Sequence, residues 1–202
     1  AQRAIDGYLE KVNRLTPKGY RKTDTSHPDF NAMLWDKVKN WWPSDESSWW
    51  LGLVGDTGDC KTRVSFLLMR ELAAKAGKRK AEHPKFRDYT FEAIAATTIS
   101  MMVAQRGDSD QEKRDAAKAR LEGLTTADFV FIDDFGKWRM TPTTQTEIFT
   151  IIDHRHANEL PTIWTANESP EQIFAGWPLD MAGPLAGRVI ESSRIIRTSS
   201  PS

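Results

Sequence analysis

The sequence predicts a three-layered α/β domain in which helices cover both faces of a parallel sheet. Two runs, Trp49–Val54 and Phe129–Ile132, are continuously apolar and too short for core helices, which is typical of buried strands. Further short apolar runs alternate with helical segments along the chain. Strands that are apolar throughout are buried on both sides, and this is the arrangement of a parallel sheet between two helical layers.

The composition is that of one globular domain. The chain has 202 residues, which is enough to bury a core without disulfides or a structural metal. Its single cysteine, Cys60, cannot form an internal disulfide, and no apolar run approaches the roughly 20 residues that span a bilayer. These features exclude a disulfide-built secreted protein and a membrane protein, and we expect a cytoplasmic protein without a membrane partner. The formal net charge of +0 means that any nucleic-acid surface must be local.

Residues 1–48 are predicted to form an N-terminal helical segment that leads into the main domain. Before Pro17, apolar residues recur on one helical face at Ile5, Tyr8, Leu9, Val12 and Leu15. After the break at Pro28, a second short helix is expected to face inward with Phe30, Met33, Leu34 and Val38. Residues 42–48 are an expected loop, residues 49–198 the expected main domain, and residues 199–202 an expected flexible tail.

The main domain is predicted to continue with alternating helices and strands. The expected helices cover about Lys61–Ala76, Thr98–Gly123 and the region around Ile148–Ile152. The expected strands after Trp49–Val54 are Tyr89–Ala93, Phe129–Ile132, Thr162–Thr165 and Arg194–Arg197. Ser169, Pro170 and Glu171 are typical of the N-cap, first-turn proline and first-turn acid of a short helix.

The clearest functional signal lies between the first strand and the helix that follows it. This segment consists of Gly55, Asp56, Thr57, Gly58, Asp59, Cys60, Lys61 and Thr62. A phosphate chain requires closely spaced backbone N–H donors, a helix N-terminus, a flexible cation and a hydroxyl for Mg²⁺, and the segment supplies all four. The glycines let the backbone approach the phosphates. We expect Lys61 to bind the β and γ oxygens and Thr62 to ligate the metal. The alternative is an ordinary glycine turn before a helix that carries an exposed lysine.

One position departs from the pattern G-x-x-x-x-G-K-[ST], because Cys60 stands where a glycine is expected. If this residue must adopt a positive φ, its side chain costs about 1 kcal/mol and crowds the phosphates. We expect nucleotide binding to tolerate this better than hydrolysis does. Cys60 is either a thiol activated by the helix N-terminus and Lys61, or a small residue that the loop tolerates.

Two aspartates follow the strand Phe129–Ile132, at the sheet edge where ligands bind in open α/β folds. We predict that Asp133 holds Mg²⁺ and that Asp134 orients or deprotonates the attacking water. Alone, the pair also fits an acidic turn that ends a core strand. About 70 residues after a phosphate loop, however, it supplies the second half of one Mg-nucleotide site.

A third polar group follows the strand Thr162–Thr165. Asn167 lies just beyond its carboxyl end, where an amide can hydrogen-bond the γ-phosphate or the attacking water. The same residue equally fits a helix-capping loop, because Ser169 and Pro170 follow it.

The segments GDTGDCKTR, FVFIDDFG and PTIWTANES, in this order and spacing, resemble the helicase-loader and transposase-helper ATPases of the AAA+ class, the DnaC/IstB-like group. The resemblance runs from about Tyr20 to Arg197. It implies a P-loop NTPase fold of AAA+ type, with a central five-stranded parallel sheet of order 5-1-4-3-2. It also implies ATP and Mg²⁺ as cofactors, and nucleotide-dependent head-to-tail oligomers whose active sites lie between subunits.

Such sites use an arginine of the neighbouring subunit to stabilise charge on the transferring phosphate. The resemblance implies that it lies shortly before the last strand, where Arg188 is the candidate and Arg194 the second choice. The alternative is a solvated surface arginine.

The resemblance implies an ATPase that helps to load a replicative helicase onto single-stranded DNA. Two alternatives remain, a transposition helper on duplex DNA and a module that binds ATP without hydrolysing it. Basic residues in the ranges Lys75–Lys85 and Lys113–Arg120 are candidate contacts for single-stranded DNA. In the second range acidic residues are interleaved, which is also typical of a solvated helix face.

Overall fold

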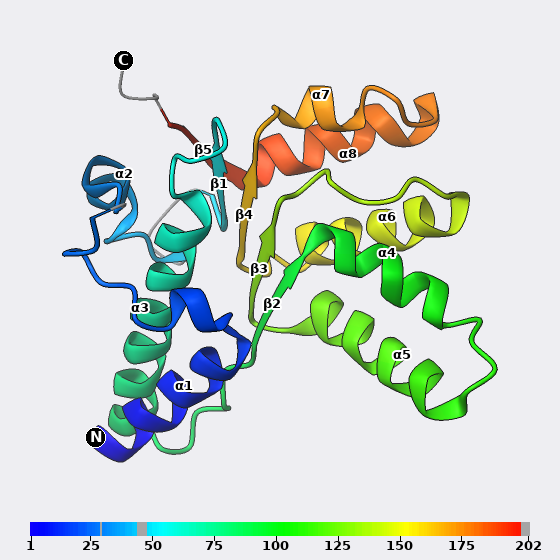
Figure 1. Ribbon diagram of the computed structural model, residues 1–202. Coiled ribbons are helices and arrows are strands. Elements are labelled where there is room, and N and C mark those ends of the chain that lie inside the picture. Colours follow the sequence, from blue (N-terminus) through cyan, green and yellow to red (C-terminus); the bar gives the residue numbers. More distant parts are fainter. Residues whose placement is uncertain (29, 44–47, 199–202) are drawn as a thin grey trace.

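The computed structural model describes residues 1–28, 30–43 and 48–198. Within them, five parallel strands form one sheet in the order β2-β3-β4-β1-β5 (Figure 1). The strands are β1 (Trp50–Val54), β2 (Phe91–Ala95), β3 (Phe129–Asp133), β4 (Thr162–Ala166) and β5 (Ser193–Arg197). The predicted order 5-1-4-3-2 is the same order counted from the other edge, so it is confirmed. Much of the expected 42–48 loop and the whole expected tail lie outside the described residues.

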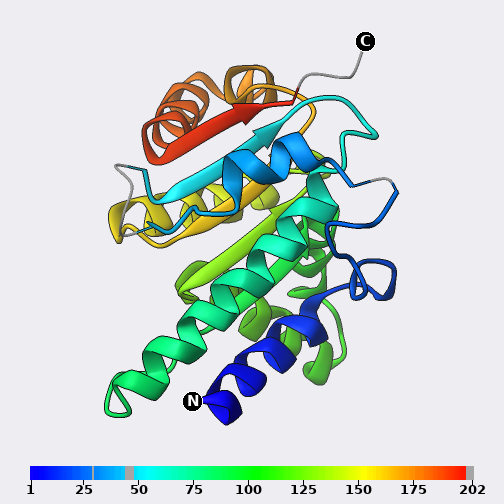
Figure 2. The same ribbon diagram turned by 90° about the vertical axis from the view of Figure 1, so that its left-hand side faces the viewer.

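Helices cover both faces of the sheet, as predicted. One face carries α1 (Gln2–Leu15), α2 (Ala32–Val38) and α3 (Lys61–Glu82), which Figure 2 views from their own side. The other face carries α4 (Ala96–Gln105), α5 (Gln111–Thr126), α6 (Pro142–Ala157), α7 (Pro170–Phe174) and α8 (Leu179–Ser192). No helix in the described part of the chain is long and apolar enough to cross a membrane.

Each face of the sheet has its own apolar core. Phe131 of β3 packs with Leu68 in the core beneath α3, whereas its neighbour Ile132 packs with Trp164 in the core of the opposite face. Successive side chains of a strand point to opposite faces, so one continuous apolar run supplies both cores. This is why the buried strands lack polar alternation.

The N-terminal helix α1 packs directly on α3. Tyr8 and Val12 are buried in the same core as Leu68. A Cβ atom on Gly77 of α3 would lie 2.5 Å from the Cα atom of Ile5. The absence of a side chain at Gly77 therefore permits the close contact between the two helices.

The strand β2 begins at Phe91 rather than at the predicted Tyr89. Phe91 pairs with Phe129 of β3. Immediately before the strand, the Thr90 N–H and hydroxyl both donate to the Asp128 carboxylate at 2.8 Å. These hydrogen bonds to the Asp128 side chain hold Thr90 just before the first residue of β2 that pairs with β3. The contact joins residues distant in sequence, so it leaves no signal in the hydrophobic pattern.

Two expectations about the first helical face were wrong. Met33 is 67% exposed rather than inward, because Leu34 and Val38, four residues apart, form the buried face of α2. Helix α3 continues to Glu82 rather than ending near Ala76.

Arg155 of α6 joins three segments from inside the protein, where it is 1% exposed. Its guanidinium donates to the carbonyl oxygens of Leu124, Ala127 and Pro161 at 3.0, 2.9 and 2.7 Å and to the Thr162 hydroxyl at 2.8 Å. Burial lowers the pKa of Arg155 to about 9, and the charge of Asp128 opposes this shift. The residue is therefore charged at neutral pH. It supplies hydrogen-bond donors to the buried carbonyl groups at the end of α5 and before β4.

Replacing Arg155 with alanine is expected to lower the free energy of unfolding by about 3–5 kcal/mol, because several buried carbonyl groups lose their donor. Denaturant unfolding followed by circular dichroism measures this. Lys118→Ala, on the exposed side of α5, is the control and should change stability by less than about 0.5 kcal/mol. Equal midpoints for the two variants would show that Arg155 is not a structural anchor.

Candidate functional site

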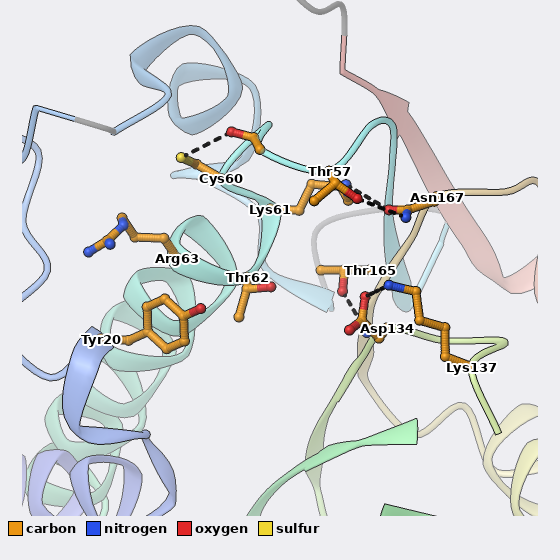
Figure 3. Close-up of a pocket in the computed structure, with 11 residues that line it drawn as sticks. Tyr20, Thr57, Cys60, Lys61, Thr62, Arg63, Asp134, Lys137, Thr165 and Asn167 are labelled. Carbon is orange, nitrogen blue, oxygen red and sulfur yellow. Dashed lines mark hydrogen bonds and ion pairs between the residues drawn. The ribbon is translucent and has the colours of Figure 1, made fainter. Parts of the chain in front are cut away.

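A cavity of about 550 Å³ opens where β1, β3 and β4 end (Figure 3). Its lining comes from Thr57, Gly58 and Cys60–Arg63, from Asp134 and Lys137 after β3, from Thr165 and Asn167 at the end of β4, and from Tyr20. The carboxyl ends of parallel strands meet at one edge of the sheet, so segments far apart in sequence converge there. Among the predicted site residues, the cavity lining does not include Gly55, Asp56, Asp59, Asp133 or Arg188.

The loop before α3 contains two residues with positive φ. Gly58 has φ 103° and Cys60, at the N-cap position of α3, has φ 59°. The condition stated for Cys60 is therefore met, and a non-glycine residue occupies a left-handed conformation at a cost of about 1 kcal/mol. After this turn, α3 begins at the cavity. Its first N–H groups therefore lie at the end of the helix that favours an anion.

Lys61 lies folded into this loop and is 8% exposed. Its Nζ atom donates to the carbonyl oxygens of Gly55 and Asp56 at 2.8 and 2.7 Å and to Asn167 Oδ1 at 3.3 Å. Burial lowers the pKa of Lys61 below its usual value, while the charge of Asp59 opposes the shift. A phosphate in the cavity favours the charged form of Lys61, so anion binding stabilises a cation that the protein alone buries at a cost.

The loop is braced from outside the cavity. The Thr198 hydroxyl donates to the Asp59 carboxylate, and Asn31 Nδ2 donates to the Asp59 carbonyl at 3.3 Å. A Cβ atom on Gly55 would lie 1.6 Å from Thr198 Oγ1. Gly55 is thus required for contact with the end of β5, a role that the motif alone does not reveal.

Asp133 connects the phosphate loop to two strands. Its Oδ1 atom accepts from Thr62 Oγ1 at 2.7 Å and from Thr165 Oγ1 at 2.6 Å. The Thr165 hydroxyl in turn accepts from the Asp134 N–H at 3.0 Å. Sequence reasoning missed Thr165, although its place at the end of β4 beside Asn167 was the available signal.

The oxygen atoms of Thr62 and Asp133 fit the predicted Mg²⁺ site. Mg²⁺ is commonly held by one or two protein oxygens together with substrate phosphates. Within the described residues no group of three or more acidic, histidine or cysteine side chains forms a metal site by itself. The two protein oxygens therefore suit an ion whose other ligands come from a bound phosphate and water.

Asp134 and Asn167 line the same cavity. Asp134 has φ 55°, and its carboxylate forms an ion pair with Lys137 at 2.8 Å. Asn167 Nδ2 donates to Thr57 Oγ1 at 3.2 Å. Thr57 is one of the residues predicted to bind the phosphates, whereas the lining residues Lys137, Tyr20 and Arg63 had no assigned role in the sequence prediction.

Arg188 lies on α8, outside the cavity of its own chain. Its guanidinium forms an ion pair with Asp153 at 2.7 Å and lies 5.0 Å from the ring centroid of Phe149. The second choice, Arg194, donates to the Lys37 carbonyl at 3.3 Å. The assignment of Arg188 to a neighbouring subunit's site stays a prediction.

Replacing Thr165 with valine removes a hydroxyl that positions both aspartates while keeping the side-chain shape. The variant is expected to lose about 1–3 kcal/mol of stability, because Asp133 loses a donor and the Asp134 N–H loses its acceptor. Thermal unfolding measures the loss. Thr150→Val, whose hydroxyl bonds only within the exposed face of α6, should stay within about 0.5 kcal/mol of the parent. Identical losses in the two variants contradict a special role for Thr165.

A scan against protein-family models and a search of curated proteins found no match to this chain. Solved structures do match it. The structure of DnaI is 17% identical, with a TM-score of 0.64, and the match covers 95% of this chain and 98% of that one. The DnaC helicase loader is 19% identical, with a TM-score of 0.58 and coverage of 91% and 100%.

A third match is AMPPCP-bound DnaA from Aquifex aeolicus, which is 15% identical with a TM-score of 0.52. It covers 91% of this chain and 50% of the DnaA chain. At these identities the likeness concerns the fold. With its strand order and the loop before α3, this chain has the P-loop NTPase fold of AAA+ type that these structures share.

Proposed function

We propose that this protein binds and hydrolyses Mg-ATP and thereby assists the loading of a replicative helicase onto single-stranded DNA. The observation that carries the ATP-binding part is the 2.7 Å hydrogen bond between Thr62 and Asp133. It joins the phosphate loop to the paired aspartates, which are the two halves of a Mg-nucleotide site. Without that contact, the two motifs would be a glycine turn and an acidic turn.

The site residues take distinct roles in this proposal. The N-terminus of α3 and Lys61 bind the phosphates, and Thr62 and Asp133 hold Mg²⁺. When bound, the ion neutralises charge that develops on the phosphate oxygens. Asp134 and Asn167, which both line the cavity, orient the attacking water. Thr165 positions both aspartates by its hydroxyl.

The partner assignment rests on the likeness to the structures of DnaI and of the DnaC helicase loader over nearly the whole chain. The nucleotide assignment is supported by AMPPCP in the similar DnaA structure. Arg188 would complete the site of a neighbouring copy, exchanging one anionic partner, Asp153, for another, the transferring phosphate. The functional unit in this proposal is a nucleotide-dependent oligomer.

The left-handed conformation of Cys60 favours one competing function, a module that binds ATP without turnover. A side chain at this position would crowd bound phosphates, since Cys60 lines the cavity. In that case the binding of ATP, without its hydrolysis, would change the affinity for the partner.

Phosphate release separates the two functions. With single-stranded DNA present, Lys61→Ala should release phosphate about 100-fold more slowly than the parent, because it lacks the cation at the β and γ oxygens. Cys60→Gly should change the rate by no more than about fivefold, the equivalent of the roughly 1 kcal/mol of strain. If the parent is as slow as Lys61→Ala and Cys60→Gly is clearly faster than both, the result supports the module that binds ATP without hydrolysing it.

Mixing two inactive variants tests whether Arg188 acts on a neighbour. Arg188→Ala and Lys61→Ala should each hydrolyse ATP at background rates, because each lacks one half of every site. A mixture should regain a measurable fraction of parent activity, since some interfaces then combine an intact Lys61 with an intact Arg188. If the mixture stays at background while each variant is folded, Arg188 does not serve a neighbouring site.

A further inference from the structure

The end of α3 that lies away from the cavity carries a concentration of positive charge. Residues 75–88 form the last turns of α3 and the start of the loop to β2, and they contain six lysine or arginine residues but only two acidic ones. Helix α3 begins at the phosphate loop and has 22 residues, so its other end lies about 33 Å away along the helix (Figure 2). The six basic residues, none of which lines the cavity, are Lys75, Lys78, Arg79, Lys80, Lys85 and Arg87.

Part of this charge is used inside the protein. Lys80 forms an ion pair with Asp88 at 3.0 Å, and Arg87 forms one with the buried Asp128. These two pairs hold the loop against α3 and against the start of β3. The exposed basic residues that form no ion pair within the described part of the chain include Lys78, Arg79 and Lys85.

An aromatic ring is exposed at the same place. Phe86 is 41% exposed, and the Arg79 guanidinium lies 6.0 Å from its ring centroid. The ring packs against Tyr89 at 5.6 Å, and Tyr89 packs against the buried Phe129 of β3 at 5.7 Å. Lys80 donates to the Phe86 carbonyl. The ring is therefore fixed through Tyr89 to the central sheet, while part of it stays open to solvent.

The combination of a fixed, exposed ring with exposed cations indicates the kind of ligand. Cations alone attract any polyanion, because they contact only phosphates or carboxylates. A ring adds affinity for bases that are not already stacked in a duplex, since an unpaired base can cover it with its own face. A single strand of nucleic acid uses both groups at once, whereas duplex DNA or an acidic protein segment would use only the cations.

We propose that Phe86, Lys78, Arg79 and Lys85, here called the distal surface, bind single-stranded DNA at the end of α3 remote from the cavity. A base stacks on Phe86 and the neighbouring phosphates contact the three cations. The inference rests on the proposed function for the identity of the strand, and it adds the surface that binds it. Because every base has an aromatic face and every nucleotide a phosphate, the distal surface binds strands of any sequence.

Fluorescence anisotropy with a labelled oligo(dT) of about 20 nucleotides tests the distal surface. Phe86→Ala should weaken binding by about fivefold or more, because one stacked base loses its platform. Phe86→Trp should keep the parent affinity, since a ring remains. The affinity of Phe86→Ala for a duplex of the same length should equal that of the parent, because paired bases do not reach the ring.

A second variant tests the cations without changing the ring. Lys85→Ala should weaken oligo(dT) binding and make the slope of log K against log salt concentration shallower by about 0.7, the value of one lost phosphate contact. Lys118→Ala is the matched control. Lys118 is an exposed lysine in the other basic range, on α5, so its loss should leave both the affinity and the slope unchanged.

The failure of this inference can be told apart from failure of the proposed function. Equal oligo(dT) affinities for the parent, Phe86→Ala and Lys85→Ala overturn the distal surface, even where DNA binds elsewhere on the protein. Equal weakening of single-strand and duplex binding by Phe86→Ala overturns the stacking role. A parent that binds Mg-ATP but no oligo(dT) overturns the distal surface and the DNA part of the proposed function, and leaves the nucleotide site intact.

Discussion

The Asp133 carboxylate is the contact on which the arrangement of the site depends. It accepts hydrogen bonds from Thr62 at the start of α3 and from Thr165 in β4, while its own backbone ends β3. Three elements that approach the cavity from different parts of the chain are thereby tied at one oxygen atom. Under the proposed function, a metal-bound phosphate would meet side chains that are already positioned, which is the condition for electrostatic catalysis without reorganisation.

This preorganisation has local costs that the rest of the fold offsets. Cys60 and Asp134 both have a positive φ, and Lys61 is buried among carbonyl groups. Such strained backbone persists where surrounding contacts determine it. Here the contacts are the hydrogen bonds of Asp59 with Thr198 and Asn31, which hold the loop to the end of β5 and to the segment before α2. The N-terminal segment therefore supports the site as well as the core.

The sequence pattern predicts the layers, the strands and the loop before α3, because buried strands and glycine-rich turns have local signatures. The strand order came instead from the resemblance to a family. Pairing of Thr90 with Asp128, the anchoring by Arg155 and the position of Thr165 all depend on residues distant in sequence, so no local pattern reveals them. The place of Tyr20 in the cavity lining was equally hidden, since no local pattern brings it beside Arg63.

The most direct measurement is the Mg²⁺ dependence of ATP binding in the parent, Thr62→Val, Asp133→Asn and the double variant, determined by titration calorimetry. If these two side chains share one ion with the phosphates, Mg²⁺ should strengthen ATP binding in the parent and each single variant should lose most of that gain. The double variant should then be no weaker than the single ones, because both act through the same ion. Retention of the Mg²⁺ effect in Asp133→Asn, or effects that simply add, would contradict the account.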